Sequence, residues 1–388
     1  MRTHESLARE IDSPMHLRGT ITGWRRSVTA VTLLACATGI CLAQHHDNDV
    51  DAFLPSPVRT VSTVPGNGDV NPYGVAFIER DFQTGSGPLK PGDILVSNFN
   101  NSKNLQGTGT TIVRISKKSS SPTVFFQGTG HLGLSTALGT LQRGFVVVGN
   151  APTTDGSAAT AQPGSLLVIN NQGKLIHTIT DPAIQYPWDM ALVDGGDSAI
   201  AFVSNALNGT VIRLEFKVSS TGLTLLSTKT KTIASGYMHR GDPVTLFVAP
   251  TGLVYDASHD VLYVASTGDN AVYAIWDAAS RNTDAGLGSI IYQDNKHLHG
   301  ALGLAAAPNG HLLVTNNDGI NPDPNQPSEI VEFTKEGRFV KQLSVDPAQG
   351  GAFGLAVDTR EDTSVLAAVN DNTATLIIWT LNVNEDRF

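Results

Sequence analysis

The chain has 388 residues, of which 40% are hydrophobic and 16% are charged, so it is long and apolar enough to bury a large core. Its formal net charge is −9, and no run of lysine or arginine interrupts the acidic balance. This composition argues against nucleic acids and anionic membranes as partners. The 38 glycines and the absence of a sustained helical period after about residue 45 favour an all-β chain.

The first 43 residues are predicted to be a targeting segment. Basic residues precede an apolar stretch, 28–43, that is too short and too small-sided for a stable membrane span. Cleavage after Ala43 would release a mature protein that begins at Gln44, and Met15 is an alternative start that gives a signal of normal proportions. We therefore expect an exported protein, periplasmic or extracellular, without an integral span in its mature chain.

Two other export signals fit the same segment. Residues 33–36, Leu-Leu-Ala-Cys, resemble a bacterial lipobox that would leave Cys36 lipidated, and Arg25-Arg26 resembles a twin-arginine signal. The second cysteine, Cys41, also lies here, so the chain after residue 43 has no disulfide and no thiolate metal site. The segment contains five basic and three acidic residues, and its removal changes the formal charge from −9 to −11.

A stretch near the C-terminus, 301–344, contains four strand signals in their simplest form. An apolar run at 302–307 is followed by a Pro-Asn-Gly turn and a second run at 311–316. After a loop rich in Asn, Asp and Pro come two further strands, at 329–333 and 339–343. This meander cannot bury both faces alone, so we expect similar units to stack on either side of it.

Six such units follow residue 58. Each contains a second strand that ends in a small polar cluster, and five steps over 272 residues separate the first cluster from the last, a period of about 54. The clusters are Ser97-Asn98, Gly149-Asn150, Ser204-Asn205, Ser266-Thr267, Thr315-Asn316 and Val369-Asn370. The first strands are predicted at 73–77, 135–139, 188–193, 252–255, 302–306 and 353–357. The period predicts an all-β, six-bladed β-propeller, which fits the even spacing better than a β-sandwich or two barrels.

The last unit is one strand short of four. Residues 59–64 form a strand without a unit of its own, so we expect this strand to complete the last blade and close the ring. The predicted organisation is a targeting segment (1–43), a flexible segment (44–57), the propeller (58–383) and a C-terminal tail (384–388).

A recurring pattern of Gly-hydrophobic-Ala, a short turn and hydrophobic-Val-Ser/Thr-Asn occurs in several units. Gly74-Val75-Ala76 precedes Leu95-Val96-Ser97-Asn98, Gly303-Leu304-Ala305 precedes Leu313-Val314-Thr315-Asn316, and Gly354-Leu355-Ala356 repeats the first part. In this pattern, residues 58–383 resemble the NHL-repeat and gluconolactonase-like family of six-bladed propellers. That family includes lactonases, amidating lyases, strictosidine synthase-like enzymes and binding scaffolds, so the resemblance implies an architecture rather than one chemistry.

The antiparallel meander predicts which face carries a site, because inter-blade connections and second-to-third-strand loops lie at the same end of each blade. This face would carry the longest such loops, at 98–109, 150–163 and 316–328, and the segments containing His131, His239-Arg240-Gly241-Asp242 and His297-Leu298-His299. The opposite face has mainly tight turns, with 79–92 as the exception. We expect the site at the loop-rich mouth.

Three histidines of the inter-blade segments, His131, His239 and His299, could converge on the axis and bind a transition metal. Asp242 or Asn150 could then support them, in an arrangement that resembles the amidating lyases in outline. The alternative is that each histidine only caps a neighbouring carbonyl.

The resemblance to gluconolactonases implies a divalent cation held by oxygen ligands, which would polarise a lactone carbonyl. Asn150, Asn205 and Asp318 or Asp371 could supply ligands, whereas the first blade begins Asn71-Pro72-Tyr73-Gly74 and offers no acid. The asparagines have a structural alternative, since Asn tolerates positive φ and bonds its own backbone in turns.

The sequence leaves two functions open. One is an exported propeller that binds a small molecule, sugar or peptide without turnover, and the other is a metal-dependent hydrolase or lyase with one divalent metal ion. We favour the first because no complete catalytic constellation can be read. The predicted ligand-binding residues are Asn98, Asn150, Asn205, Arg240, Asp242, Asn316, Asp318 and Asn370. We expect a monomer.

Overall fold

The computed structural model describes residues 52–54, 59–130, 132–359 and 363–382, all of which belong to one compact unit. The regular secondary structure of these residues is almost entirely β-strand, with two short 3-10 helices, η2 (Ala158–Thr160) and η3 (Ser227–Lys229). Within these ranges no helix is long and apolar enough to cross a membrane. The prediction of an all-β chain is confirmed.

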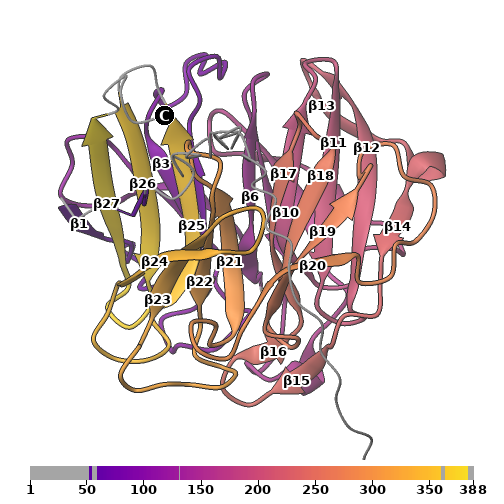
Figure 1. The fold of residues 1–388 in the computed structure, drawn as a ribbon. Helices are drawn as coiled ribbons and strands as arrows, with labels where there is room; N and C mark the ends of the chain where they lie inside the picture. The colour runs from indigo at the N-terminus through magenta and orange to yellow at the C-terminus, as the bar shows by residue number, and fades with distance from the viewer. Residues whose placement is uncertain (1–51, 55–58, 131, 360–362, 383–388) are drawn as a thin grey trace, which may run out of the picture. The chain divides into compact units, whose positions relative to one another are not determined.

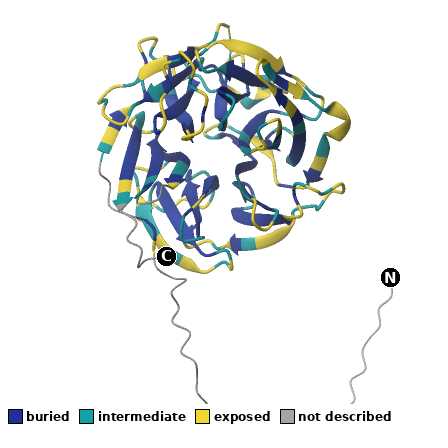
Figure 2. Cartoon of the chain, turned by 90° about the horizontal axis from the view of Figure 1, so that it is seen from above, coloured by how far each residue is buried: buried dark blue, intermediate teal, exposed yellow. Residues whose placement is uncertain are grey.

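Six antiparallel sheets of at least four strands surround a common axis (Figures 1 and 2). Blade 1 consists of β2 (Val70–Phe77), β3 (Ile94–Asn100), β4 (Thr111–Ile115) and β5 (Thr123–Gln127). Blade 2 consists of β6 (Leu134–Leu141), β7 (Phe145–Asn150), β8 (Ser165–Asn170) and β9 (Leu175–Ile179). Blade 3 consists of β10 (Pro187–Asp194), β11 (Ser198–Asn205), β12 (Thr210–Ser219), β13 (Gly222–Leu225) and β14 (Lys231–Ala234). Blade 4 consists of β17 (Pro250–Asp256), β18 (Val261–Ser266), β19 (Ala271–Trp276) and β20 (Ser289–Gln293). Blade 5 consists of β21 (Ala301–Ala306), β22 (Leu312–Asn316), β23 (Glu329–Phe333) and β24 (Phe339–Ser344). Blade 6 consists of β25 (Ala352–Thr359), β26 (Thr363–Asn370), β27 (Thr375–Asn382) and, from the N-terminal part of the chain, β1 (Arg59–Ser62). The six-bladed propeller predicted from the sequence is confirmed.

The ring closes as the sequence predicts. Strand β1 pairs antiparallel with β27, with Arg59 opposite Ile378 and Ser62 opposite Thr375. The innermost strand of each blade contacts that of the next blade, and β25 contacts β2 across the last junction. The Arg59 guanidinium also donates to backbone carbonyls in the β4–β5 turn of blade 1. The N-terminal strand therefore links the last blade to the first.

Small residues in the inner strands allow neighbouring blades to approach closely. At Gly252, Gly303 and Gly354 an added methyl group would meet the backbone of the inner strand of the next blade. For Gly354 the atom in the way is the carbonyl oxygen of Tyr73, so this glycine is required by close contact between backbones.

We expect Gly354→Ala to lower the free energy of unfolding by about 3 kcal/mol, because backbone atoms must separate to admit the methyl group. The matched control is Gly66→Ala, since a methyl group at Gly66 meets no atom within 4 Å. Urea denaturation of both variants checks this, and equal midpoints for the two variants would contradict it.

Hydroxyl groups tie five of the six blades to the next blade, four of them from the end of the second strand or beside it. Three of these hydroxyls donate to inner-strand carbonyl oxygens of the following blade: Ser97 to Ser135 (2.8 Å), Ser204 to Thr251 (2.7 Å) and Thr315 to Phe353 (2.5 Å). Thr267 makes the same bond to Ala301, and Thr136 makes it to Trp188 from within an inner strand. In blade 6 the corresponding position is Val369, which has no hydroxyl. The Ser/Thr part of the repeated motif is therefore explained by blade-to-blade bonding.

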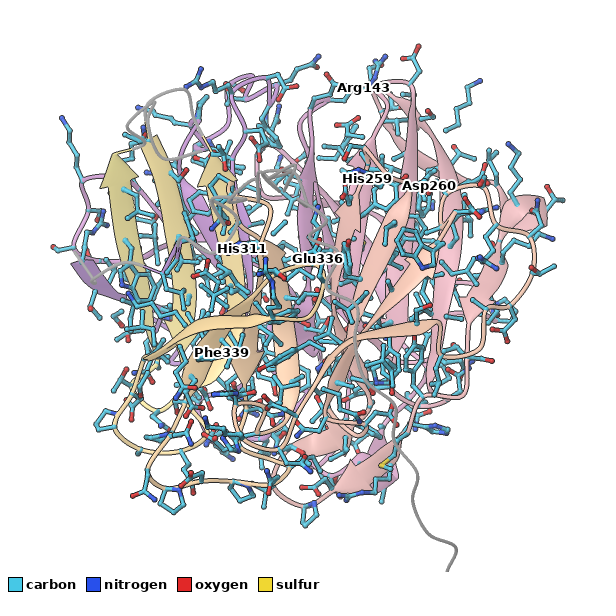
Figure 3. The ribbon with its side chains drawn as sticks, in the orientation of Figure 1. Arg143, His259, Asp260, His311, Glu336 and Phe339 are labelled. Carbon is cyan, nitrogen blue, oxygen red and sulfur yellow. The ribbon has the colours of Figure 1, made fainter. Side chains whose placement is uncertain are left out.

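Residues 52–54 lie within the segment predicted to be flexible, and they are packed. Phe53 and Leu54 are 5% and 3% exposed, in the core between blades 5 and 6. The buried Glu332 carboxylate accepts hydrogen bonds from the backbone N–H groups of both residues at 2.7–3.0 Å. It also lies 2.7 Å from Nδ1 of His311, a residue that is labelled in Figure 3. The N-terminal segment is thus held by a preformed polar group as well as by apolar packing.

Blade 3 and the connection after it differ from the simple meander. The outer edge of blade 3 is divided, since β13 pairs with the end of β12 and β14 pairs with its beginning. The following connection contains a separate hairpin of β15 (Arg240–Asp242) and β16 (Leu246–Val248). Asp242 closes the hairpin turn by accepting hydrogen bonds from the N–H groups of Val244 and Thr245. The sequence analysis treated this hairpin only as part of an inter-blade segment.

Candidate functional site

The axis of the ring has two different ends. We call the end with the inter-blade connections and the second-to-third-strand loops the connection end, and the end with the turns between first and second strands the turn end. The β15–β16 hairpin marks the connection end, at the bottom of Figure 1. The predicted long loops lie at this end, as the strand order requires.

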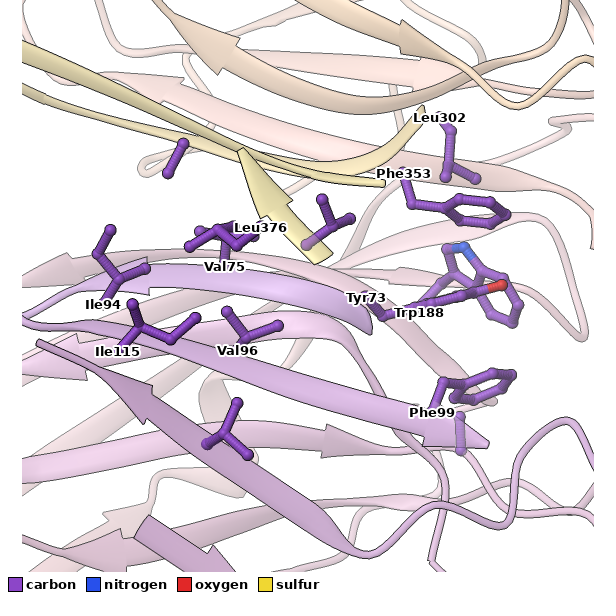
Figure 4. Close-up of a cluster of buried hydrophobic side chains, with 14 of the residues drawn as sticks. Tyr73, Val75, Ile94, Val96, Phe99, Ile115, Trp188, Leu302, Phe353 and Leu376 are labelled. Atoms are coloured by element: carbon purple, nitrogen blue, oxygen red, sulfur yellow. The ribbon is translucent and has the colours of Figure 1, made fainter. Parts of the chain in front are cut away.

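Aromatic side chains fill the axis at the connection end. We call the following six residues the axial aromatic cluster: Tyr73, Phe99, Tyr186, Trp188, Phe247 and Phe353. Ring centroids of neighbouring members lie 4.6–6.1 Å apart, and all six residues are at most 8% exposed. Figure 4 shows several of these rings, contributed by different strands. The loop-rich mouth is therefore closed at the axis.

The β15–β16 hairpin lies over this cluster and reaches the loops of three other blades. Its Phe247 ring belongs to the cluster, and the carbonyl oxygen of Val244 accepts a hydrogen bond from the Gln106 amide of blade 1. The hairpin also contacts Ala158 in blade 2 through Gly241, and Gly319 in blade 5 through Thr245. The three longest predicted loops thus meet around the hairpin.

An open cavity occupies the turn end of the axis. It has two connected parts of about 310 and 400 Å³, which share Val75, Leu138 and Met190 among their lining residues. The inner part is lined mainly by glycines, small apolar side chains and the backbone of the inner strands. Cavities of this size hold small molecules rather than folded partners.

The inner part of the cavity contains one carboxylate, that of Asp189 on β10. Its oxygens accept hydrogen bonds from the N–H groups of Met190 (2.7 Å) and Leu253 in the next blade (3.0 Å). Burial raises the pKa of Asp189 to about 7, and these two hydrogen bonds oppose the shift without cancelling it. The side chain therefore changes charge near neutral pH in a place where a ligand could contact it.

The outer part of the cavity is acidic. Glu79, Asp81 and Asp194 line it together with Gln142, and no lysine, arginine or histidine is among the residues that line either part. Arg143, close by in sequence, instead donates to the carbonyl oxygen of Gly196 (Figure 3). A cavity with four carboxyl groups and no basic side chain favours cationic ligands.

The predicted asparagine ligands have a shared structural role instead. Each ties the end of a second strand to the connection that precedes its own blade, and none has a positive φ. The partners are Thr63 for Asn98, Gly133 for Asn150, Gln185 for Asn205, His299 for Asn316 and Val345 for Asn370. Four of the five are fully buried or nearly so, and none lines the cavity. These asparagine side chains therefore anchor the connections, and the positive φ of the structural alternative does not occur at them.

The charged residues predicted at the mouth also bond within the protein. Arg240 and Asp242, two residues apart on β15, pair with each other at 2.9 Å. Asp318 accepts hydrogen bonds from the N–H groups of Ser328 (3.0 Å) and Gly350 (2.8 Å). All three lie at the connection end, away from the cavity.

Of the three histidines predicted to bind a metal, only His239 and His299 can be placed, because His131 lies outside the described residues. His239 is exposed, with Nδ1 3.0 Å from the carbonyl oxygen of Tyr237. His299 is 2% exposed, and its Nδ1 donates to the carbonyl oxygen of Asn321. Among the described residues, no group of three or more His, Cys, Asp and Glu is placed to hold a metal ion.

The sequence analysis missed Asp189. The inner strands of blades 1, 4, 5 and 6 carry glycine at the corresponding place, namely Gly74, Gly252, Gly303 and Gly354. The usable signal was therefore a break in the glycine pattern: blade 3 carries a carboxylate at a place where four other blades carry glycine.

Comparisons with solved structures support the fold. An α-L-arabinanase from Penicillium chrysogenum, solved with arabinobiose, matches with a TM-score of 0.52 and 10% identity over 85% of this chain and 99% of that chain. Virginiamycin B lyase from Staphylococcus aureus matches with a TM-score of 0.45 and 12% identity over 85% of this chain and 90% of that chain. No protein-family model and no curated protein matches the sequence. The chain is a six-bladed β-propeller, and at these identities the likeness extends to the fold alone.

Proposed function

We propose that this protein binds a small cationic molecule in the cavity at the turn end of its axis. The observation that carries the proposal is the single carboxylate of Asp189 inside an otherwise small-sided, apolar cavity. A ligand ammonium or guanidinium group could pair with this carboxylate while its apolar part contacts Leu138 and Leu253. The acidic rim would attract cations and slow their escape.

This proposal differs from the sequence prediction in the position of the ligand. The sequence favoured the loop-rich mouth, whereas the open cavity lies at the opposite end of the axis. Membership of the NHL-repeat and gluconolactonase-like family, which the sequence resemblance implies, stays a prediction. The cavity is also too narrow for a folded partner, so a peptide would enter only by a side chain or a terminus.

We expect ethanolamine to bind more tightly than ethylene glycol, its neutral counterpart, in isothermal titration calorimetry at pH 8. Replacing Asp189 by Asn should weaken ethanolamine binding by roughly 10-fold or more, because the ligand charge then loses its buried partner. The affinity of the wild-type protein should rise between pH 6 and pH 8, as Asp189 loses its proton.

The control for this experiment is Asp155→Asn, which changes an exposed carboxylate in the 150–163 loop, away from the cavity. It should leave the affinity for ethanolamine unchanged. Equal affinities for ethanolamine and ethylene glycol, or an Asp189→Asn variant that binds like the wild type, would exclude the proposed role of Asp189.

We also propose that the protein is exported, on the basis of the basic and apolar pattern in residues 1–43. N-terminal sequencing of protein secreted by cells should find Gln44 as the first residue. A mature chain that begins at a lipid-modified Cys36 would instead support the lipoprotein alternative, and an intact segment 1–30 would rule out cleavage.

A further inference from the structure

Buried polar atoms without partners gather in the axial aromatic cluster. The Tyr186 hydroxyl and the Trp188 indole nitrogen have no hydrogen-bond partner among the described residues, although these two residues are 0% and 1% exposed. The side-chain oxygen of Asn71, at the start of β2 and two residues before Tyr73 of the cluster, also has no partner among the described residues. Buried polar atoms are normally bonded, so several unpaired groups in one place indicate a missing partner.

A carboxylate lies near one ring of the cluster, that of Tyr73. Asp371 follows β26 at the connection end, and no described residue donates a hydrogen bond to its side chain. It is close enough to Tyr73 for its charge to contribute to the raised pKa of that phenol. Aromatic rings and a carboxylate together form the usual environment of a bound organic cation.

The β15–β16 hairpin has the features of a movable cover. It forms a two-stranded sheet that pairs with no blade strand in the described part of the chain, so side-chain packing and the Gln106 hydrogen bond hold it in place rather than a β-ladder. Val244 at its tip is 78% exposed. Leu246, which precedes the inserted Phe247, has a φ of 63°, a strained value for a residue with a side chain.

We propose that the hairpin is a lid, and that its opening exposes a second binding site for a small quaternary ammonium compound in the axial aromatic cluster. The Phe247 ring marks the place of the ligand, because opening the hairpin withdraws this ring. Its centroid lies 4.9 Å from that of Tyr186 and 6.1 Å from that of Trp188. A cation at this point would lie at cation–π distance from Tyr186 and at the limit of that distance from Trp188, with Asp371 supplying the opposite charge.

The lid can be locked by a disulfide to the loop of blade 5. A methyl group at Gly319 would lie 2.8 Å from the γ-methyl group of Thr245, so the two Cβ positions are close enough for a Thr245→Cys/Gly319→Cys bridge. The native cysteines, Cys36 and Cys41, are replaced by serine. One protein can then be compared reduced and oxidised, which removes folding differences between variants.

The probe is choline, with the uncharged 3,3-dimethylbutan-1-ol as its carbon counterpart, in isothermal titration calorimetry. We expect the reduced protein to bind choline more tightly than the alcohol, and oxidation to weaken choline binding by roughly 10-fold or more because the lid cannot open. Addition of a reducing agent should restore the affinity. Absence of choline binding to the reduced protein, or equal binding by both forms, overturns the proposal.

Two single variants separate this site from the cavity at the turn end. Asp371→Asn should weaken choline binding by roughly 10-fold, while its melting temperature shows that the protein is folded. If choline binding instead depends on Asp189 and not on Asp371, choline occupies the cavity and the lidded site is excluded. If ethanolamine does not bind at Asp189 but choline binding depends on Asp371, the proposed function is wrong and the site under the hairpin is supported. The two outcomes can be distinguished because different residues are replaced to test each site.

Discussion

Deletion of residues 44–62 is expected to unfold the ring at temperatures at which the full chain stays folded. The deletion removes β1, the fourth strand of blade 6, and with it the buried side chain of Val61, which is 2% exposed. It also removes Arg59, whose guanidinium bonds blade 6 to the β4–β5 turn of blade 1. Blade 6 would then lack its outer strand, which the N-terminal part of the chain contributes.

The same deletion removes Phe53 and Leu54 from the core between blades 5 and 6 and leaves Glu332 buried without their N–H groups. Burial of an aliphatic or aromatic side chain contributes about 1.5–3 kcal/mol, and removing the partners of a buried charge costs about 3–5 kcal/mol. The sum is comparable to the whole stability of a domain, roughly 5–15 kcal/mol.

Thermal unfolding followed by circular dichroism tests this expectation. The matched control is a deletion of residues 44–51, which leaves every described contact of Phe53, Leu54 and β1 in place. We expect the control to melt close to the full chain. If both deletions melt at the temperature of the full chain, the N-terminal strand does not close the ring in solution.

The stability of the propeller should be greatest at mildly acidic pH and should fall as the pH rises to 8. Burial raises the pKa values of Asp189, Glu329 and Asp371 to about 7, from ordinary values near 4. Each group thus favours folding in its protonated form. This stability is fully present below about pH 4 and is lost as the pH rises through 7, at ~1.4 kcal/mol for each unit of raised pKa.

Other carboxylates act in the opposite direction at lower pH. The His297 side chain and neighbouring N–H groups lower the pKa of Asp294 to about 2 despite its partial burial, and Lys335 lowers the pKa of Asp256. Their contribution is present above about pH 4 and is lost in stronger acid. We therefore expect the melting temperature to peak near pH 4–5 and to fall by several degrees at pH 8. An Asp189→Asn/Asp371→Asn variant should show a weaker fall, and an unchanged slope would contradict the assignment.

The six-bladed architecture could be predicted from the sequence because the same packing constraints act on successive blades. Glycine at the inner strand, and Ser or Thr beside Asn at the end of the second strand, are each required by contacts that recur from blade to blade. Because the same contacts recur in several blades, the residues that make them recur at a regular spacing in the sequence. The β15–β16 hairpin occurs once and spans few residues, so periodicity could not reveal it.

The candidate site was harder to predict for the same reason. The asparagines were conspicuous because they repeat, and they repeat because every blade must anchor its connection. Asp189 occupies a position that is glycine in four of the other five blades, and its importance depends on a cavity that forms only when six inner strands come together. Which end of the axis is open depends on the packing of aromatic residues from three separate blades and a hairpin, and no local sequence pattern encodes that packing.

The docking of Phe53 and Leu54 onto Glu332 also sets an order of events during biosynthesis. These residues leave the ribosome early, but the carboxylate that receives their N–H groups lies 278–279 positions further along the chain. The N-terminal segment must wait until the fifth blade exists, and β1 must wait for β27 near the very end. Such late, long-range pairings slow folding and keep the nascent chain open for most of its synthesis. A protein that must cross a membrane before it folds would gain time from this delay.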